Sequence, residues 1–248
     1  MTELVHLDVA DRVATITLDS EHNRNALSRQ LVTELGEHLA TVAEDATVRA
    51  VVVRSAHRVF CSGADLSEAA TGAMTDGAAA LVAIQRRLAT LPQPVVVELG
   101  GPVRAGGLGI VGAVDVVVAA RSVTFALTEV RLALAPAVIS LSLLPRLSPR
   151  AASDVFLTAR QFDATEAAEI GLVSHVVADD ALGDRVAAVV ADLVEGHPQG
   201  LRETKALLNH DLVARIDALG GAVAEQSARL FGSSEAREAM TAFLSRRR

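Results

Sequence analysis

The chain of 248 residues has no tryptophan or tyrosine and only 6 phenylalanines, although 50% of its residues are hydrophobic. Its core must therefore be built from aliphatic side chains. It also has a single cysteine, Cys61, which excludes an internal disulfide and a thiolate metal cluster and fits a reducing, intracellular compartment. No histidine or other base is evident near Cys61 in the sequence, so we interpret it as a small buried residue rather than a nucleophile.

Clustered basic residues are also lacking. The chain has 23 Lys and Arg against 30 Asp and Glu, which gives a formal net charge of -7. This balance disfavours a nucleic-acid partner, because phosphate binding needs clustered cations. The basic run at 246–248 is too short to reverse it, and we expect that run to cap the last helix or to fray.

Signals for a membrane or a metal are missing as well. The N-terminus lacks a basic segment followed by an apolar stretch, and no uncharged run is long enough to cross a bilayer. The 7 histidines do not cluster at the spacing of metal ligands. We therefore expect a soluble, cytoplasmic protein with no membrane partner and no metal.

Strand-like and helix-like segments alternate in the first half of the chain. Runs rich in β-branched residues occur at 13–18, 50–53, 95–97 and 115–118. Between them, apolar residues recur at helical spacing, first at Leu31, Leu35, Leu39 and Val42 and then at Leu81, Ile84 and Leu88. Because the strand runs are continuously apolar rather than alternating, we predict an α/β fold with strands covered on both faces.

The pattern becomes helical from about residue 136, and 174–177 is the last strand candidate. We predict an α/β core at 1–195 and a helical C-terminal extension at 196–248, with helices near 199–209, 213–231 and 235–246. Its many apolar positions should pack on the core or on a neighbouring subunit. A stretch rich in Ala, Gly and Thr at 69–80 is predicted to be a mobile loop.

Two glycine-bearing segments carry the main indication of chemistry. FCSGADL at 60–66 and GPVRAGGLG at 101–109 each follow a strand-like run and offer small residues where bare backbone N–H groups could face a ligand. Two such groups that converge on one carbonyl oxygen form an oxyanion hole, which points to an enzyme. The alternative is that Gly63 and Gly106 are ordinary turn glycines.

A second motif suggests a different ligand. Residues 107–112 match the G-x-G-x-x-G pattern of dinucleotide-binding proteins, and Glu129 lies near the distance expected for a ribose-binding acid. That glycine turn normally follows the first strand of its sheet, whereas here two strand–helix units precede it. We therefore disfavour a dinucleotide cofactor.

Several motifs taken together resemble the crotonase family, also called the enoyl-CoA hydratase/isomerase superfamily. The resemblance extends over almost the whole chain, and its order and spacing are more specific than any single motif. The motifs are ITLD at 16–19, NRNALS at 23–28, FCSGADL at 60–66, PVVV at 94–97 with the glycine-rich turn, DVVVAA at 115–120, FALTEVRL at 125–132, LTARQFDA at 157–164, GLV at 171–173 and SEAREAM at 234–240. The resemblance implies a crotonase-like spiral of ββα units that assembles as a homotrimer or homohexamer through its C-terminal helices.

The resemblance also implies a substrate and a site. The backbone N–H groups of Ala64 and Gly106 would hold the thioester oxygen of an acyl-CoA, whose α-carbanion is an enolate with its charge on that oxygen. Coenzyme A would be part of the substrate, and no separate cofactor is implied. The residues placed near the substrate are Arg24, Asn25, Ala26, Ala64, Asp65, Leu66, Arg104 and Gly109. For Asp65 we favour a helix N-cap, with substrate contact through its backbone only.

Glu129 aligns with one of the two catalytic glutamates of the hydratases, and the second would stand at Gly109. Hydration needs a water placed at the β-carbon and a proton delivered to the α-carbon, so the missing glutamate is the main departure from the family pattern. Our first hypothesis is an enoyl-CoA hydratase. The alternatives are an isomerase that uses Glu129 alone as a proton shuttle, an acyl-CoA-binding protein with little turnover, and, for Glu129 itself, an ordinary surface glutamate.

A further departure concerns the acyl group. LAPAVIS at 134–140 replaces the Pro-Gly turn of many hydratases and resembles members assigned to methylglutaconyl-CoA-type hydration, whose substrates carry an extra carboxylate. Arg104 could bind such a carboxylate. The competing hypothesis, which we favour at this point, is that Arg104 forms an ion pair with Glu98.

Overall fold

The computed structural model describes residues 2–69 and 74–245. Its main sheet has six strands in the order β1-β2-β3-β4-β6-β9. The strands are β1 (Val5–Ala10), β2 (Val13–Leu18), β3 (Ala50–Ser55), β4 (Val95–Leu99), β6 (Val116–Ala120) and β9 (His175–Val177). Only β1 is antiparallel to its neighbour, and the other pairs are parallel. The predicted α/β class is confirmed.

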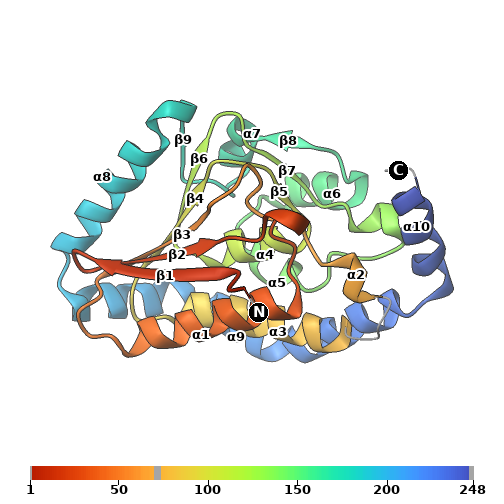
Figure 1. Cartoon of the computed structure of the whole chain (residues 1–248), viewed down its shortest axis with the longest axis horizontal. Coiled ribbons are helices and arrows are strands. Elements are labelled where there is room, and N and C mark those ends of the chain that lie inside the picture. The colour runs from red at the N-terminus through yellow and green to blue at the C-terminus, as the bar shows by residue number, and fades with distance from the viewer. Residues whose placement is uncertain (1, 70–73, 246–248) are drawn as a thin grey trace.

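Helices pack on this sheet through the apolar positions seen in the sequence (Figure 1). α1 (Arg29–Glu44) begins at Ser28, whose side chain accepts a hydrogen bond from the N–H of Leu31, and it buries the predicted leucine stripe against β1 and β2. α3 (Met74–Thr90) lies beside α1, and α8 (Leu182–Glu195) packs on β3, β4 and β6. Further helical segments are α2 (Leu66–Ala69), α4 (Gly106–Ala113), α5 (Ser140–Leu143), α6 (Pro149–Thr158), α7 (Ala164–Glu169) and the 3₁₀ turns η1 (Glu21–Asn23), η2 (Glu129–Leu132) and η3 (Asp179–Ala181).

A second, three-stranded sheet stands beside the first. Its strands are β5 (Val103–Arg104), β7 (Thr124–Ala126) and β8 (Phe162–Asp163), in that order. β5 and β7 are parallel, and β8 is antiparallel to β7. Phe125 and Phe162 stack across the latter pair with ring centroids 5.4 Å apart. The sequence did not predict these strands, because two or three residues are too few for a periodic pattern.

The C-terminal region forms one long helix and one short helix. α9 runs without interruption from Pro198 to Phe231, so the predicted division into helices near 199–209 and 213–231 is wrong. No proline or glycine occurs between those two segments, and Asn209 is held by hydrogen bonds to the Ala89 carbonyl and the Asp115 carboxylate. α9 packs along α3, as Figure 1 shows at the lower edge of the molecule. The boundary near residue 196 stays a prediction.

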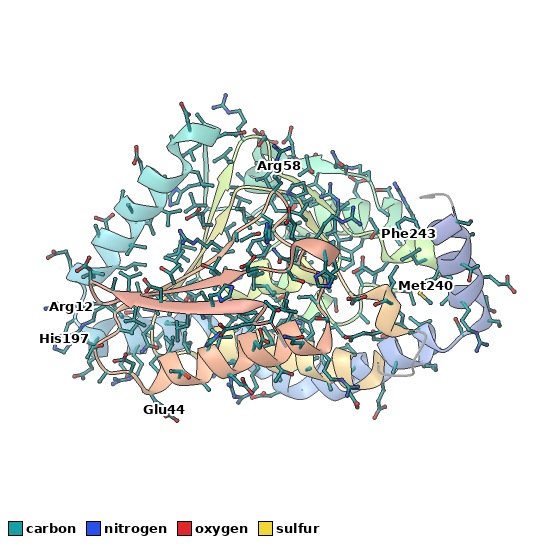
Figure 2. The ribbon with its side chains drawn as sticks, in the orientation of Figure 1. Arg12, Glu44, Arg58, His197, Met240 and Phe243 are labelled. Carbon is teal, nitrogen blue, oxygen red and sulfur yellow. The ribbon has the colours of Figure 1, made fainter. Side chains whose placement is uncertain are left out.

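The last helix, α10 (Ser234–Ser245), packs against η2 and the end of α9. Ala236 and Met240 pack with Leu132 and Leu134, which follow Glu129, and with Leu66 of α2. Figure 2 labels Met240 and Phe243 on this helix. The C-terminal region therefore covers the end of the segment at 60–66 and the turn that begins at Glu129.

Two sequence predictions concern segments at the edge of the described region. The loop expected at 69–80 is wrong in part, because α3 already begins at Met74, whereas 70–73 lie outside the described residues. The basic run at 246–248 also lies outside them. Within the described ranges, no helix combines the length and apolarity required to cross a membrane.

Candidate active site

Three chain segments run parallel and end at the same place. Cys61 bridges Val103 in parallel, and Val103 in turn pairs with Phe125 of β7. Ala64 follows Cys61 by three residues and Gly106 follows Val103 by three, while Glu129 follows Phe125 by four. Because adjacent parallel strands share their carboxyl ends, this register brings the three predicted catalytic positions to one end of the small sheet.

The N–H groups of Ala64 and Gly106 are free within the part of the chain that the structure describes. The neighbouring amides form hydrogen bonds: Leu27 donates to the Gly63 carbonyl at 2.8 Å and Ala105 donates to the Ala126 carbonyl at 3.0 Å. Neither Ala64 nor Gly106 donates to any described residue. A β-carbon placed on Gly106 would lie 3.8 Å from the Ala64 nitrogen. The N–H groups of Ala64 and Gly106 thus lie side by side without an acceptor, and the N–H of Gly106 stands at the start of α4.

Tight backbone contact brings the two segments together. Gly63 has φ 98°, and a β-carbon there would be 2.9 Å from that of Ala105 and 3.8 Å from the Gly106 nitrogen. Ala105 itself has φ 46° and ψ -120°, an unfavourable conformation for a residue with a side chain. Strain of this kind persists only where the surrounding structure enforces it, and it is typical of functional sites.

Glu129 supplies a carboxylate near this end of the sheet. The residue as a whole is partly exposed, yet its Oε2 is shielded from solvent and has no hydrogen-bond partner among the described residues. Burial raises the pKa of Glu129 to about 7, an effect opposed only by a hydrogen bond from its own backbone N–H. Such a carboxyl group can both take and give a proton near neutral pH. An ordinary surface glutamate does not have these properties.

The position of the missing second glutamate is filled by other side chains. A β-carbon on Gly109 would lie 2.9 Å from Ile139 Cγ2 and 3.4 Å from Gln85 Cδ. The Gly109 carbonyl accepts a hydrogen bond from the Ser142 hydroxyl at 3.0 Å. The loop that carries Ile139 therefore leaves no room for a second carboxylate at Gly109, and the departure seen in the sequence extends to the packing around it.

Of the three residues at 24–26, only Arg24 presents its side chain to solvent. Asn25 is fully buried: its Oδ1 accepts from the Ser20 N–H at 2.7 Å, and its Nδ2 donates to the Ser55 hydroxyl at 2.8 Å. Ala26 is also buried. The Arg24 carbonyl accepts a hydrogen bond from the Ser62 N–H at 3.1 Å, which holds this turn beside the segment at 60–66. Among residues 24–26, Arg24 is therefore the one whose positive charge could bind a phosphate.

Asp65 and Leu66 hold the next turn of chain. The Asp65 carboxylate accepts from the N–H and hydroxyl of Ser67 and from the side-chain amide of Asn23. Burial alone would raise the pKa of Asp65, but these hydrogen bonds lower it below its ordinary value. The predicted capping role is confirmed, because Asp65 precedes α2 and accepts from its second residue. Leu66 packs in the cluster under α10.

Arg104 does not pair with Glu98, so the ion pair favoured from the sequence is wrong. Its guanidinium donates to the carbonyl and hydroxyl of Thr124 and to the side chain of Gln161. Glu98 belongs to the six-stranded sheet, whereas Arg104 belongs to the three-stranded one. Burial lowers the pKa of Arg104, and no described carboxylate neutralises its charge.

The remaining candidates have structural roles. Cys61 is fully buried, and burial raises the pKa of its thiol to about 12, so it is not a nucleophile. The G-x-G-x-x-G match lies inside α4 rather than in a turn before a helix, which removes the argument for a dinucleotide. Its glycines instead allow close packing, since a β-carbon on Gly107 would be 2.7 Å from that of Cys61.

A surface pocket of about 930 Å³ lies beside the turn at 23–28. Its lining includes Asn23, Ser28 and Asp65 together with residues of the N-terminal segment. Carboxylates of Glu3, Asp19, Glu21, Asp65 and Glu68 contribute to that lining. Three histidines also line the pocket, but its described lining contains no lysine or arginine and its carboxylates do not suit the phosphates of coenzyme A, so Arg24 offers the complementary charge.

Sequence reasoning missed the residues that surround the free amides. The β-carbon direction of Gly106 meets Leu27 Cδ1 at 2.8 Å and Leu81 Cδ2 at 3.5 Å, and one turn along α3 Gln85 faces Gly109. A signal for Gln85 was present, since it occupies an apolar position four residues after Leu81. Its polar character there has no explanation in a simple helix pattern.

Comparison with known proteins gives a consistent result. The family described as Enoyl-CoA hydratase/isomerase matches residues 8–248. The 1,2-epoxyphenylacetyl-CoA isomerase of Escherichia coli is 30% identical over 100% of this chain and 97% of its own, and the mitochondrial methylglutaconyl-CoA hydratase of Homo sapiens is 29% identical over 98% of this chain and 74% of its own. The crystal structure of an enoyl-CoA hydratase from Mycobacterium avium superposes with a TM-score of 0.92 and 43% identity, covering 99% of this chain and 98% of that one. The chain therefore belongs to the enoyl-CoA hydratase/isomerase family.

Proposed function

We propose that the protein hydrates a 2-enoyl-CoA thioester, with Glu129 as its single acid–base group. Family members act on acyl-CoA thioesters. The proposal depends chiefly on one observation. The free N–H groups of Ala64 and Gly106 and the Glu129 carboxylate, whose Oε2 is buried without a partner among the described residues, lie at the same end of the small sheet. Burying the Glu129 oxygen without a partner is costly, so its retention beside two free N–H groups favours a ligand that satisfies them.

The chemistry follows from these groups. The thioester oxygen accepts hydrogen bonds from Ala64 and Gly106, which polarise the conjugated double bond. The oxygen of a water molecule bonds to the β-carbon while Glu129 takes one of its protons, and the π electrons move to give the enolate. Glu129 then returns the proton to the α-carbon, which restores the thioester and the carboxylate. One group can do both tasks because its pKa is near neutral.

The decisive assay is the ultraviolet absorbance of a conjugated 2-enoyl-CoA. We expect the absorbance to fall on addition of the protein, with formation of the 3-hydroxyacyl thioester identified by mass. A protein that binds the thioester measurably but never changes its absorbance would instead be an acyl-CoA-binding module.

A second candidate is an isomerase that moves a 3-enoyl double bond into conjugation. The observation in its favour is that the space beside Gly109 is filled, so a single carboxylate remains to carry the proton. This reaction needs no water at the β-carbon. The same assay separates the two functions, because isomerisation makes the absorbance of a 3-enoyl substrate rise.

Arg104 is the residue to test for recognition of an acidic acyl group. Its charge lacks a described carboxylate partner, and a guanidinium can bind a carboxylate through two parallel hydrogen bonds. We expect Arg104→Leu to raise KM about tenfold or more for a glutaconyl-type substrate and to change KM little for a plain enoyl substrate. Equal changes for both substrates would show that Arg104 only holds Thr124 and Gln161.

We further propose that the chain assembles as a trimer or hexamer. Large leucines are exposed on the helices, with Leu157 of α6 76% exposed and Leu207 and Leu208 of α9 80% and 74% exposed. Exposed apolar groups of this size favour burial against another subunit. Light scattering would measure the mass directly.

A further inference from the structure

One buried polar atom beside the proposed site has no role in the chemistry described so far. Gln85 is fully buried on α3, and its Oε1 has no hydrogen-bond partner among the described residues. Its Nε2 donates to the Val138 carbonyl at 3.2 Å. A buried amide oxygen without a partner costs free energy, so its presence calls for a ligand atom or a water that donates to it.

The surroundings place the Gln85 carboxamide one helical turn from the free N–H groups of Ala64 and Gly106. On the side of α4 that faces α3, Gly106 lies against Leu81, and Gly109 lies against Gln85. Gly106 and Gly109 are three residues apart on one helix, and Leu81 and Gln85 are four apart on the other, so both pairs share the same faces. The Gln85 carboxamide therefore lies on the α3 side of the contact with α4, one turn from the place where Leu81 faces Gly106.

The orientation of the amide is fixed by its neighbours. Both groups that contact Nε2, the carbonyls of Val138 and Leu81, are acceptors, so the nitrogen must face them and the oxygen must face elsewhere. The loop containing Val138 follows η2, the turn on which Glu129 stands. Gln85 thus links α3 to the loop that fills the second-glutamate position, and its Oε1 remains an open acceptor that cannot itself take a proton.

We propose that Gln85 Oε1 accepts a hydrogen bond from the attacking water and positions that water at the β-carbon. The inference rests on the proposed hydration. In that step one O–H of the water points to Gln85, the other proton passes to Glu129, and the oxygen lone pair forms the bond to the β-carbon. Gln85 neither gains nor loses a proton. It therefore replaces the orienting task of the missing glutamate and leaves all proton transfer to Glu129.

The test compares two reactions of one variant. Gln85→Leu should reduce kcat for hydration about 100-fold, because a misplaced reactant loses most of its catalytic advantage, with little change in KM. Exchange of the α-proton of a saturated acyl-CoA in D₂O, followed by NMR, should be retained, because it needs Glu129 and the two amides but no positioned water. Gln85→Glu should recover part of the hydration rate and add a second ionisation to its pH profile.

Gln93→Leu is the matched control. Gln93 is also buried, its Oε1 also lacks a partner in the described structure, and its Nε2 donates to the Val42 carbonyl, but it precedes β4 and does not face α4. Hydration should be unchanged in this variant. If Gln85→Leu hydrates as fast as the wild type, or if it loses α-proton exchange in the same proportion, the inference is wrong. A wild-type protein that hydrates no enoyl-CoA would refute the proposed function itself.

Discussion

Glu129→Gln should lower the hydration rate about 1,000-fold and at the same time make the protein more stable at pH 8. The loss of rate follows from removing the only acid–base group of the proposed mechanism, for which losses of this order are usual. Binding of the substrate should be nearly unchanged, because the Ala64 and Gly106 amides and the acyl surface remain. Steady-state kinetics and a direct binding measurement with a saturated acyl-CoA would check both parts.

The gain in stability has the same physical cause as the catalytic role. Burial raises the pKa of Glu129 to about 7 from an unfolded value of 4.5. As pH rises above 4.5, the unfolded chain loses this proton before the folded protein does, so the folded state loses stability progressively until about pH 7. The full cost is about 3 kcal/mol at pH 8, of which a neutral amide should relieve about 2 kcal/mol, or about 5 °C in Tm.

Two measurements separate this explanation from a general effect of mutation. At pH 4 the carboxyl group is neutral in both states, so the stabilisation by Glu129→Gln should disappear. Wild-type kcat/KM should fall about tenfold for each pH unit below 7, since Glu129 starts the reaction as a carboxylate. A variant that keeps the wild-type rate, or whose added stability does not depend on pH, would contradict the assigned role.

Glu34→Gln provides a control of opposite sign. Glu34 lies on α1 and accepts hydrogen bonds from the N–H groups of Leu4 and Val5. Burial alone would raise the pKa of Glu34, but hydrogen bonds from Gln30 and those two amides lower it. Its ionised form is therefore stabilised by folding, and replacement should reduce stability at pH 8 without changing kcat.

The sequence was sufficient for the parts of the fold that repeat a local pattern. Continuous valine runs predicted β3, β4 and β6, and the spacing of Leu31, Leu35 and Leu39 predicted the buried face of α1. Local patterns of this kind survive folding because each segment satisfies its own backbone and exposes an apolar face. The small sheet was beyond such reasoning, since β5 and β8 have two residues each and exist only through pairing with distant segments.

Some features of the candidate site could likewise be predicted from the sequence, and others depend on how distant segments pair. Motif order predicted where Ala64, Gly106 and Glu129 stand in the chain, but their common end depends on the register between Cys61, Val103 and Phe125. The error over Arg104 and Glu98 has a related cause: residues six apart were treated as neighbours, whereas the glycine turn between them moves the chain from one sheet to another. The polar side chain of Gln85 in an apolar stripe was a signal, but its role could not be predicted, because an unpaired oxygen is a property of packing and is absent from any sequence pattern.

Lys205→Met should destabilise the protein by about 3–5 kcal/mol, the usual cost of leaving one charge of a buried pair alone. Lys205 Nζ lies 2.7 Å from Asp115 Oδ2, with the two side chains 5% and 16% exposed, and it also donates to the Gln93 carbonyl. Burial lowers the pKa of Lys205, and the attraction of Asp115 opposes this effect. Thermal unfolding should show a Tm lower by about 10 °C.

The exposed pair between Arg86 of α3 and Asp217 of α9 is the matched control, because it also joins α9 to the rest of the fold. Its side chains are 50% and 47% exposed, so Arg86→Met should cost at most about 1 kcal/mol. The Lys205–Asp115 and Arg86–Asp217 pairs thus both involve α9, but only the first is buried. If both variants lose equal stability, the cost reflects loss of a contact to α9 rather than an unpaired buried charge.

A second variant identifies the source of the cost at Lys205. The Asp115 carboxylate also accepts from the Val95 N–H at 2.7 Å and from the Asn209 amide at 3.0 Å, so it keeps two hydrogen-bond donors when the lysine is removed. Asp115→Asn in the Lys205→Met background removes the orphaned charge, and the double variant should lose less stability than the sum of the single ones. Simple addition of the two losses would mean that packing of the lysine stem, and not its charge, holds α9 against the sheet. We expect the double variant to lose less than this sum. That result would mean that the charge of Lys205 holds α9 in place, and α9 in turn supports α3 with Leu81 and Gln85 beside the site.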